Sequence, residues 1–197
     1  MLHGKRKEKQ VNIFYLDMNP RKSAHYHCDS HVRKMVLEYA QMLSVGHWTS
    51  THPDDIDRAI DFRLYKPTHM KHPSVKWCNS SALAYTYVFT MWEELQIIYA
   101  HKYGKPHSSN TRHNGLLCMP YKILSKKING KYSFEHHMTP PPMCFGREWS
   151  HIRRGVNPLD NKEVVKAYRN YYKVAKYKFA TWGKGRKLPS WWLKLVS

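Results

Sequence analysis

Residues 29–46, DSHVRKMVLEYAQMLSVG, show the clearest structural pattern in this chain. Apolar side chains recur in this stretch at steps of three and four residues, at Val32, Met35, Val36, Tyr39, Met42 and Leu43. This spacing predicts a helix that buries one apolar stripe. Asp29 suits the N-cap position and Gly46 suits a helix end, so we expect the helix to run between them.

Two further segments follow the same period. Residues 73–104 begin with Pro73, which fits a first helical turn, and end with Gly104, a common stop signal. Residues 160–182 begin with Asp160 and Glu163, which are spaced as in a capping box. The sequence therefore predicts a mainly α-helical fold, a single compact domain of three principal helices with long loops.

The segments between these helices are less regular. Residues 11–17, VNIFYLD, alternate in polarity and predict either one short N-terminal strand or an extended lead-in that pins the chain to the core. Residues 47–72 predict loop with a short helix at 56–63. Residues 105–158 predict irregular structure, in which Asn129-Gly130 favours a hairpin turn.

Composition bounds the domain count and the class of partner. The chain has 197 residues, 42% of them hydrophobic, and a formal net charge of +19. We expect residues 1–10 to form a basic disordered arm and residues 11–197 to form a single domain. A charge excess of this size is usually kept because a polyanion neutralises it, which indicates nucleic acid. The alternative is a basic surface that only keeps the protein soluble.

Cysteine usage and hydropathy indicate the compartment. The four cysteines, Cys28, Cys78, Cys118 and Cys144, form no Cys-x-x-Cys pair, which argues against a zinc ribbon and fits a reducing environment. No apolar run approaches the roughly 20 residues of a membrane span. We therefore expect a cytoplasmic monomer that does not enter a membrane.

The densest cluster of reactive side chains is HYHCDSH, residues 25–31. His31 and Glu38 are seven residues apart, and seven helical steps of about 100° return a side chain to nearly the same face. A half-buried carboxylate at this place could act as an acid or base. The candidate catalytic residues are Glu38, His31, Asp29 and His27.

Each member of this cluster also has a plainer interpretation. Glu38 could be an ordinary surface residue, and the histidines could only cap the helix. The main expectation is that no cofactor is needed. The alternative is a divalent metal, Zn or Mg, held by His27, Asp29 and His31, although their spacing matches no recognised metal motif.

Basic and aromatic side chains near the predicted helix ends form a candidate nucleic-acid surface. The residues are Lys34, His72, Lys76, Trp77, Lys105, His107, Lys173, Lys184 and Arg186. Lysines beside phosphates and an aromatic ring beside a base would make a coherent contact set. The alternative is that Trp77 belongs to the core and that the lysines only solvate the helix ends.

Three segments resemble a known family. HVRKMVLE (31–38), HPSVKWCNSSALAYTYVFTMWEELQIIYAHKYGKPHSS (72–109) and the aromatic helix with Tyr171-Tyr172 resemble the phage endonuclease V type, the pyrimidine-dimer DNA glycosylases. NIFYLD (12–17) and HCDSHVRKMVLEYAQ (27–41) also resemble uncharacterised short phage and bacterial proteins. The resemblance implies a catalytic carboxylate at Glu38, a DNA-contacting histidine at His31 and double-stranded DNA as the substrate.

The chain departs from that family at the nucleophile. The family uses the α-amino group of its second residue, whereas here ten residues precede the segment that matches the family's start. Either a lysine such as Lys34 replaces this amine, or Val11 marks the true start, or the chemistry differs. The family's arginines beside its glutamate are also absent, with Leu37 and Gln41 near those places.

Three functional hypotheses follow. The leading one is a DNA glycosylase or a glycosylase-like enzyme that turns its target nucleotide out of the stack. The second is a metal-assisted nuclease or hydrolase built on the HYHCDSH cluster. The third is a phage nucleic-acid-binding protein without catalysis.

Overall fold

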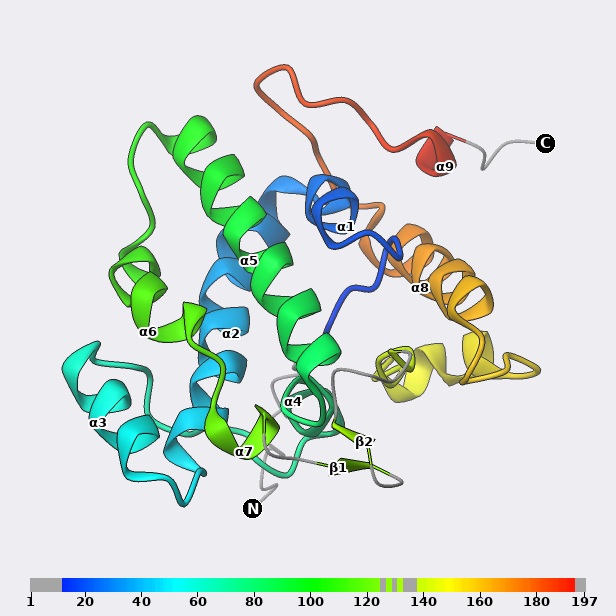
Figure 1. Ribbon diagram of the computed structural model, residues 1–197. Coiled ribbons are helices and arrows are strands. Elements are labelled where there is room, and N and C mark those ends of the chain that lie inside the picture. The colour runs from blue at the N-terminus through cyan, green and yellow to red at the C-terminus, as the bar shows by residue number, and fades with distance from the viewer. Residues whose placement is uncertain (1–11, 125–126, 129–130, 133–137, 194–197) are drawn as a thin grey trace, which may run out of the picture.

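Two long helices, α2 (Asp29–Trp48) and α5 (Ala82–Tyr103), pack against each other at the centre of the molecule (Figure 1). The computed structural model describes residues 12–124, 127–128, 131–132 and 138–193. The third principal helix is α8 (Asn161–Lys176). The prediction of a mainly α-helical fold is confirmed.

Helix α2 forms close to its predicted bounds, but its cap differs. Cys28 occupies the N-cap position without a side-chain cap bond, and Asp29 is the first helical residue. The Asp29 carboxylate accepts a hydrogen bond from the Gly183 N–H at 2.8 Å instead. The prediction of Asp29 as N-cap is therefore wrong, because a distant segment claims its side chain.

The predicted helix over 73–104 is divided into α4 (Pro73–Cys78) and α5. Asn79 stands at the break, where its amide donates to the Met42 and Val75 carbonyls at 3.0 Å each. Ser81 then caps α5 by accepting from the Ala84 N–H at 3.2 Å. Short polar side chains that bond to nearby backbone compete with the helical ladder, and two of them interrupt it here.

Helix α8 begins as predicted and ends earlier. The Asp160 carboxylate accepts from the Lys162 and Glu163 N–H groups at 2.7 and 3.0 Å. The Glu163 side chain bonds to the Asn157 N–H rather than to Asp160, so the capping box is only half formed. The chain leaves the helix at Lys176 and reaches α9 (Ser190–Leu193) through an irregular segment.

The short helix predicted at 56–63 is present and begins three residues earlier, as α3 (Pro53–Asp61). The segment predicted to be irregular, 105–158, contains further short helices, which are η1 (Ser108–Arg112), α6 (His113–Leu117), α7 (Tyr121–Leu124) and η3 (Arg147–Arg153). Helix α1 (Pro20–Tyr26) lies in a segment for which the sequence made no prediction. The two strands expected beside the predicted hairpin turn are present, since β1 (Lys127–Ile128) pairs antiparallel with β2 (Lys131–Tyr132). The turn residues, Asn129 and Gly130, lie outside the described residues.

Residues 12–17 form no strand and follow the alternative prediction, an extended lead-in. Their apolar side chains are buried, and the Leu16 N–H donates to Ser23 Oγ at 3.1 Å. The predicted arm, residues 1–10, lies outside the described residues.

The core is rich in aromatic side chains, and several of their polar atoms bond to the backbone. The Trp92 indole N–H donates to the Val36 carbonyl at 2.8 Å and thereby joins α5 to α2. The Tyr172 hydroxyl accepts from the Cys28 N–H at 2.8 Å and joins α8 to the start of α2. Among the described residues, no helix has both the length and the apolar character needed to span a membrane.

Candidate functional site

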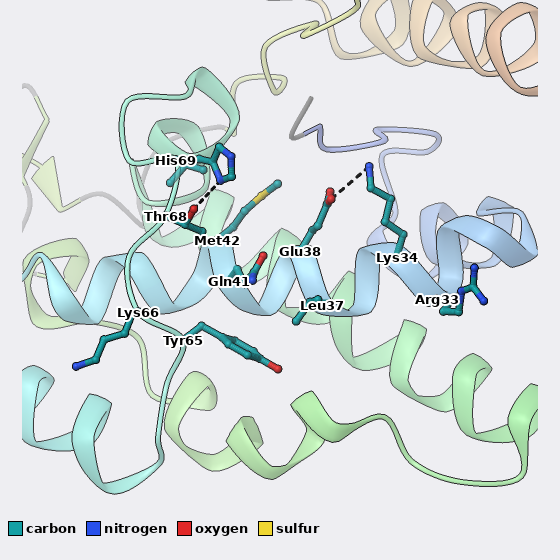
Figure 2. Close-up of a pocket in the computed structure, with 11 residues that line it drawn as sticks. Arg33, Lys34, Leu37, Glu38, Gln41, Met42, Tyr65, Lys66, Thr68 and His69 are labelled. Atoms are coloured by element: carbon teal, nitrogen blue, oxygen red, sulfur yellow. Dashed lines mark hydrogen bonds and ion pairs between the residues drawn. The ribbon is translucent and has the colours of Figure 1, made fainter. Parts of the chain in front are cut away.

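A hollow of about 640 Å³ lies between α2 and the segment that leads to α4 (Figure 2). We call it the Glu38 hollow. Its lining residues come from one face of α2 and from the chain that crosses that face. They are Arg33, Lys34, Leu37, Glu38, Gln41, Met42, Tyr65, Lys66, Thr68, His69 and Val75. The volume falls within the range of about 300–1,000 Å³ typical of ligand sites.

The crossing segment is held by contacts on both sides. The Tyr65 N–H donates to Ser44 Oγ at 3.2 Å, which ties the segment to α2. The Arg112 guanidinium lies 4.0 Å from the centre of the Tyr65 ring. The Lys66 ammonium lies 3.8 Å from the centre of the Trp48 ring. These contacts give the hollow a fixed outer wall.

Glu38 is the only acid among the described residues that line this hollow. Its Oε1 atom lies 3.2 Å from the Lys34 Nζ atom, and Figure 2 shows the two side chains pointing toward one another. The Glu38 side chain is 16% exposed and the Lys34 side chain is 51% exposed. A nearby ammonium stabilises the charged carboxylate, which suits a base or a stabiliser of positive charge.

Asp29 is engaged within the fold. Its carboxylate lies 2.7 Å from Lys102 Nζ and 3.0 Å from an Arg186 nitrogen, and it accepts from the Gly183 N–H. Burial opposes ionisation of Asp29. The hydrogen bonds from Lys102 and Gly183 and the charges of Lys102 and Arg186 outweigh it and hold the pKa below its usual value. Asp29 therefore joins α2, α5 and the segment near residue 183.

His27 is fully buried, and both of its ring nitrogens have partners. Nδ1–H donates to the Ser23 carbonyl at 2.7 Å, and Nε2 accepts from the Tyr39 hydroxyl at 3.0 Å. Burial, with a smaller contribution from the Arg186 charge, lowers the pKa of His27 to about 4 despite its bond to Ser23. The His27 ring is therefore part of the packed core.

His31 lies apart from Glu38. Its ring stacks on Phe14 with centroids 4.4 Å apart and meets Tyr172 edge-on at 5.1 Å. Burial is the main reason that the pKa of His31 lies well below its usual value, with the charges of His27, Lys176 and Lys34 as further causes. The predicted alignment of His31 with Glu38 does not place both side chains in one hollow.

The metal alternative gains no support from this arrangement. The His27 nitrogens and the Asp29 carboxylate are each committed to other partners. Within the described part of the chain, no group of three or more His, Cys, Asp or Glu side chains is placed to hold a metal ion.

The predicted nucleic-acid residues divide into two groups. Lys76, Lys105 and Lys184 are exposed, Lys173 is half-buried, and Lys34 lines the Glu38 hollow. The others serve the fold, and His72 and His107 accept from backbone N–H groups as helix caps.

Trp77 and Arg186 are the clearest corrections. Trp77 is 8% exposed and its indole N–H donates to the Thr139 carbonyl at 3.0 Å. Arg186 bonds to Asp29 and to the His25 and His27 carbonyls. Neither side chain is available to nucleic acid in this structure, because core packing or an internal ion pair already occupies it.

A second hollow, of about 550 Å³, shares Arg33 and Lys34 with the first. We call it the Phe179 hollow. It is lined by Ser30, His31, Arg33, Lys34, Lys176 and Phe179. Arg33 and Gln41 were not predicted as site residues, although both lie one helical turn from residues of the Glu38 face. No sequence signal joins Tyr65, Lys66 and His69 to that face.

No protein-family model, curated protein or solved structure matches this chain. The resemblance to pyrimidine-dimer glycosylases therefore stays a prediction.

Proposed function

We propose that this protein is a base-directed enzyme of nucleic acid, a DNA glycosylase or a close analogue, and that Glu38 is its catalytic base. The single observation that carries the proposal is the largely buried carboxylate of Glu38 in a hollow whose other charged residues, among those that the structure describes, are Arg33, Lys34 and Lys66. The cations would hold the phosphates and the Glu38 carboxylate would face the sugar. As part of this proposal we place the enzyme in the cytoplasm, where it would have access to DNA.

The net charge supports a polyanionic substrate. With +19 formal charges, the protein attracts nucleic acid over long range and releases counterions on binding. The hollow is of a size that admits one nucleotide turned out of a duplex, as enzymes that act on bases require.

The proposed chemistry is divided between a water molecule and Glu38. The Lys34 Nζ atom is already engaged by the Glu38 carboxylate at 3.2 Å, so we assign the attack on the sugar to water. Glu38 accepts a proton as the water oxygen bonds to the sugar C1′ atom. The bond between C1′ and the base nitrogen breaks, its electron pair stays on that nitrogen, and a proton from Glu38 neutralises the released base. Glu38 also stabilises the positive charge that develops on the sugar.

The test is incubation with a panel of duplex and single-stranded oligonucleotides that contain normal, modified or damaged bases. Free base and strand cleavage are measured separately, with and without a chelator. Release of base that is insensitive to the chelator is the expected result. In Glu38→Gln, which keeps the shape but loses the charge, release should fall by roughly a hundredfold or more while binding stays close to wild type.

Asp57→Asn is the control, since Asp57 is an exposed acid outside the Glu38 hollow and outside the neighbouring Phe179 hollow. Cleavage abolished by the chelator would overturn the proposal in favour of a metal-assisted nuclease. Tight binding without release of any base across the panel would overturn it in favour of a binding protein.

A further inference from the structure

The Phe179 hollow joins cationic side chains to an exposed aromatic ring. Arg33, Lys34 and Lys176 supply three positive charges, and no acid is present among its described lining residues. The hollow opens beside the Glu38 hollow, because Arg33 and Lys34 line both. A ligand that spans the two hollows would therefore pass these two cations.

Two of the three cations have no anionic partner in the described structure. Lys34 pairs with Glu38, whereas Arg33 and Lys176 form no ion pair with any described residue. Burial and the nearby charge of Lys34 lower the pKa of Lys176, and the more weakly acting charges of Cys28 and Glu148 do not compensate for them. Like charges held together at a hollow repel one another, and a bound anion would relieve that repulsion.

Phe179 provides the apolar side of the hollow. Its side chain is 48% exposed, and its ring meets the buried His31 ring at a centroid distance of 5.9 Å. The residue follows the end of α8, where its N–H donates to the Lys176 carbonyl at 3.1 Å. Phe179 and Lys176 both line the hollow, and part of the ring surface is open to solvent.

A nucleotide combines an anionic phosphate with a flat base, and these two groups match the cations and the aromatic ring of the hollow. Proteins that bind unpaired strands combine cations for the backbone with aromatic rings on which bases stack. We propose that the Phe179 hollow binds the nucleotide next to the one held in the Glu38 hollow. The connecting phosphate lies at Arg33 and Lys34, a phosphate contact is made by Lys176, and the second base stacks on Phe179.

This inference rests on the proposed function and narrows its substrate class. Two adjacent nucleotides with their bases turned into separate hollows cannot both remain stacked in a duplex. The substrate is then a single-stranded or locally opened stretch of nucleic acid. A fully paired duplex binds less well, because two bases must first be unstacked before they can enter the hollows.

The experiment measures binding of a fluorescently labelled oligothymidylate by anisotropy over a range of salt concentrations. Lys176→Gln should weaken binding severalfold and reduce the magnitude of the salt slope by about one. Phe179→Leu should weaken binding by roughly tenfold without changing the slope, because it removes stacking and no charge. Phe179→Tyr should restore most of the affinity.

Two controls lie outside the hollow. Lys166→Gln removes an exposed lysine from α8, and Tyr177→Leu removes an aromatic side chain that is 60% exposed. Thermal unfolding of each variant verifies that the fold is retained. Losses in Lys176→Gln and Phe179→Leu no larger than in these controls would overturn the inference. So would equal affinity for the oligothymidylate and for a fully paired duplex.

The experiments can refute either of the two proposals without refuting the other. If base release depends on Glu38 while the Phe179 hollow variants bind like their controls, only this inference fails. If those variants lose binding but no base is ever released, the nucleotide subsite stands and the glycosylase proposal fails.

Discussion

Replacing Asp29 by asparagine tests whether that carboxylate serves the fold. Asp29 faces Lys102 at 2.7 Å and Arg186 at 3.0 Å, and the exposed fractions of these two side chains are only 17% and 10%. Asp29→Asn keeps the size and removes the charge, so two largely buried cations lose their counterion. Removing one partner of a buried ion pair typically costs about 3–5 kcal/mol.

Asparagine can still accept the hydrogen bond from Gly183, so we expect a loss near the lower limit, about 3 kcal/mol. For a chain of this size each kcal/mol lowers the midpoint of thermal unfolding by roughly 2–4 °C, so the expected decrease is about 10 °C. Urea unfolding followed by circular dichroism measures the free energy directly.

The pH dependence supplies an independent readout. Because the pKa of Asp29 is held below its usual value in the folded state, its contribution is fully present above the unfolded pKa of about 4. It is lost as the pH falls through the lower folded pKa. The difference in stability between wild type and Asp29→Asn should therefore shrink below about pH 4.

Asp54→Asn is the control, since the Asp54 side chain is 56% exposed. A loss in Asp29→Asn below about 1 kcal/mol, similar to that of the control, would refute the structural role of Asp29. Asp29 would then return as a candidate for catalysis.

Three more predictions follow from other parts of the molecule. Burial is the main reason that the pKa of His27 and that of His47 are each lowered to about 4 in the folded protein. Between about pH 4 and 6.5 the unfolded chain therefore binds more protons than the folded protein does. The free energy of unfolding should fall as pH decreases through this window, and a flat profile would contradict the burial of neutral histidines. Gly46→Ala should cost about 1–3 kcal/mol, because the added Cβ would overlap Asn79 Oδ1 and lie 2.9 Å from Pro120 Cγ; wild-type stability would show that this contact can relax. Nucleic-acid affinity should decrease steeply with salt concentration because of the +19 charge, and a log–log slope near zero would contradict electrostatic binding.

The sequence contained part of the candidate site. Helical periodicity placed Lys34 and Glu38 one turn apart on α2, and the structure joins them at 3.2 Å. It could not supply Tyr65 or His69, because no periodic relation connects a loop to the helix face that it crosses. Phe179 was expected inside the third helix, yet the helix ends at Lys176 and leaves that ring beside the start of α2.

The sequence by itself determined the helical class, the positions of α2 and α8 and the cationic character of the molecule. These properties depend on local spacing and on composition, which a linear chain displays directly. Only the tertiary structure decided which polar side chains remain available. The sequence made Asp29 and His27 candidate catalytic residues and Arg186 a candidate nucleic-acid contact, but partners up to 161 residues away engage them internally. The burial and the pairing of a side chain depend on which distant segments pack against it. Local sequence patterns such as helical periodicity carry no information about those contacts.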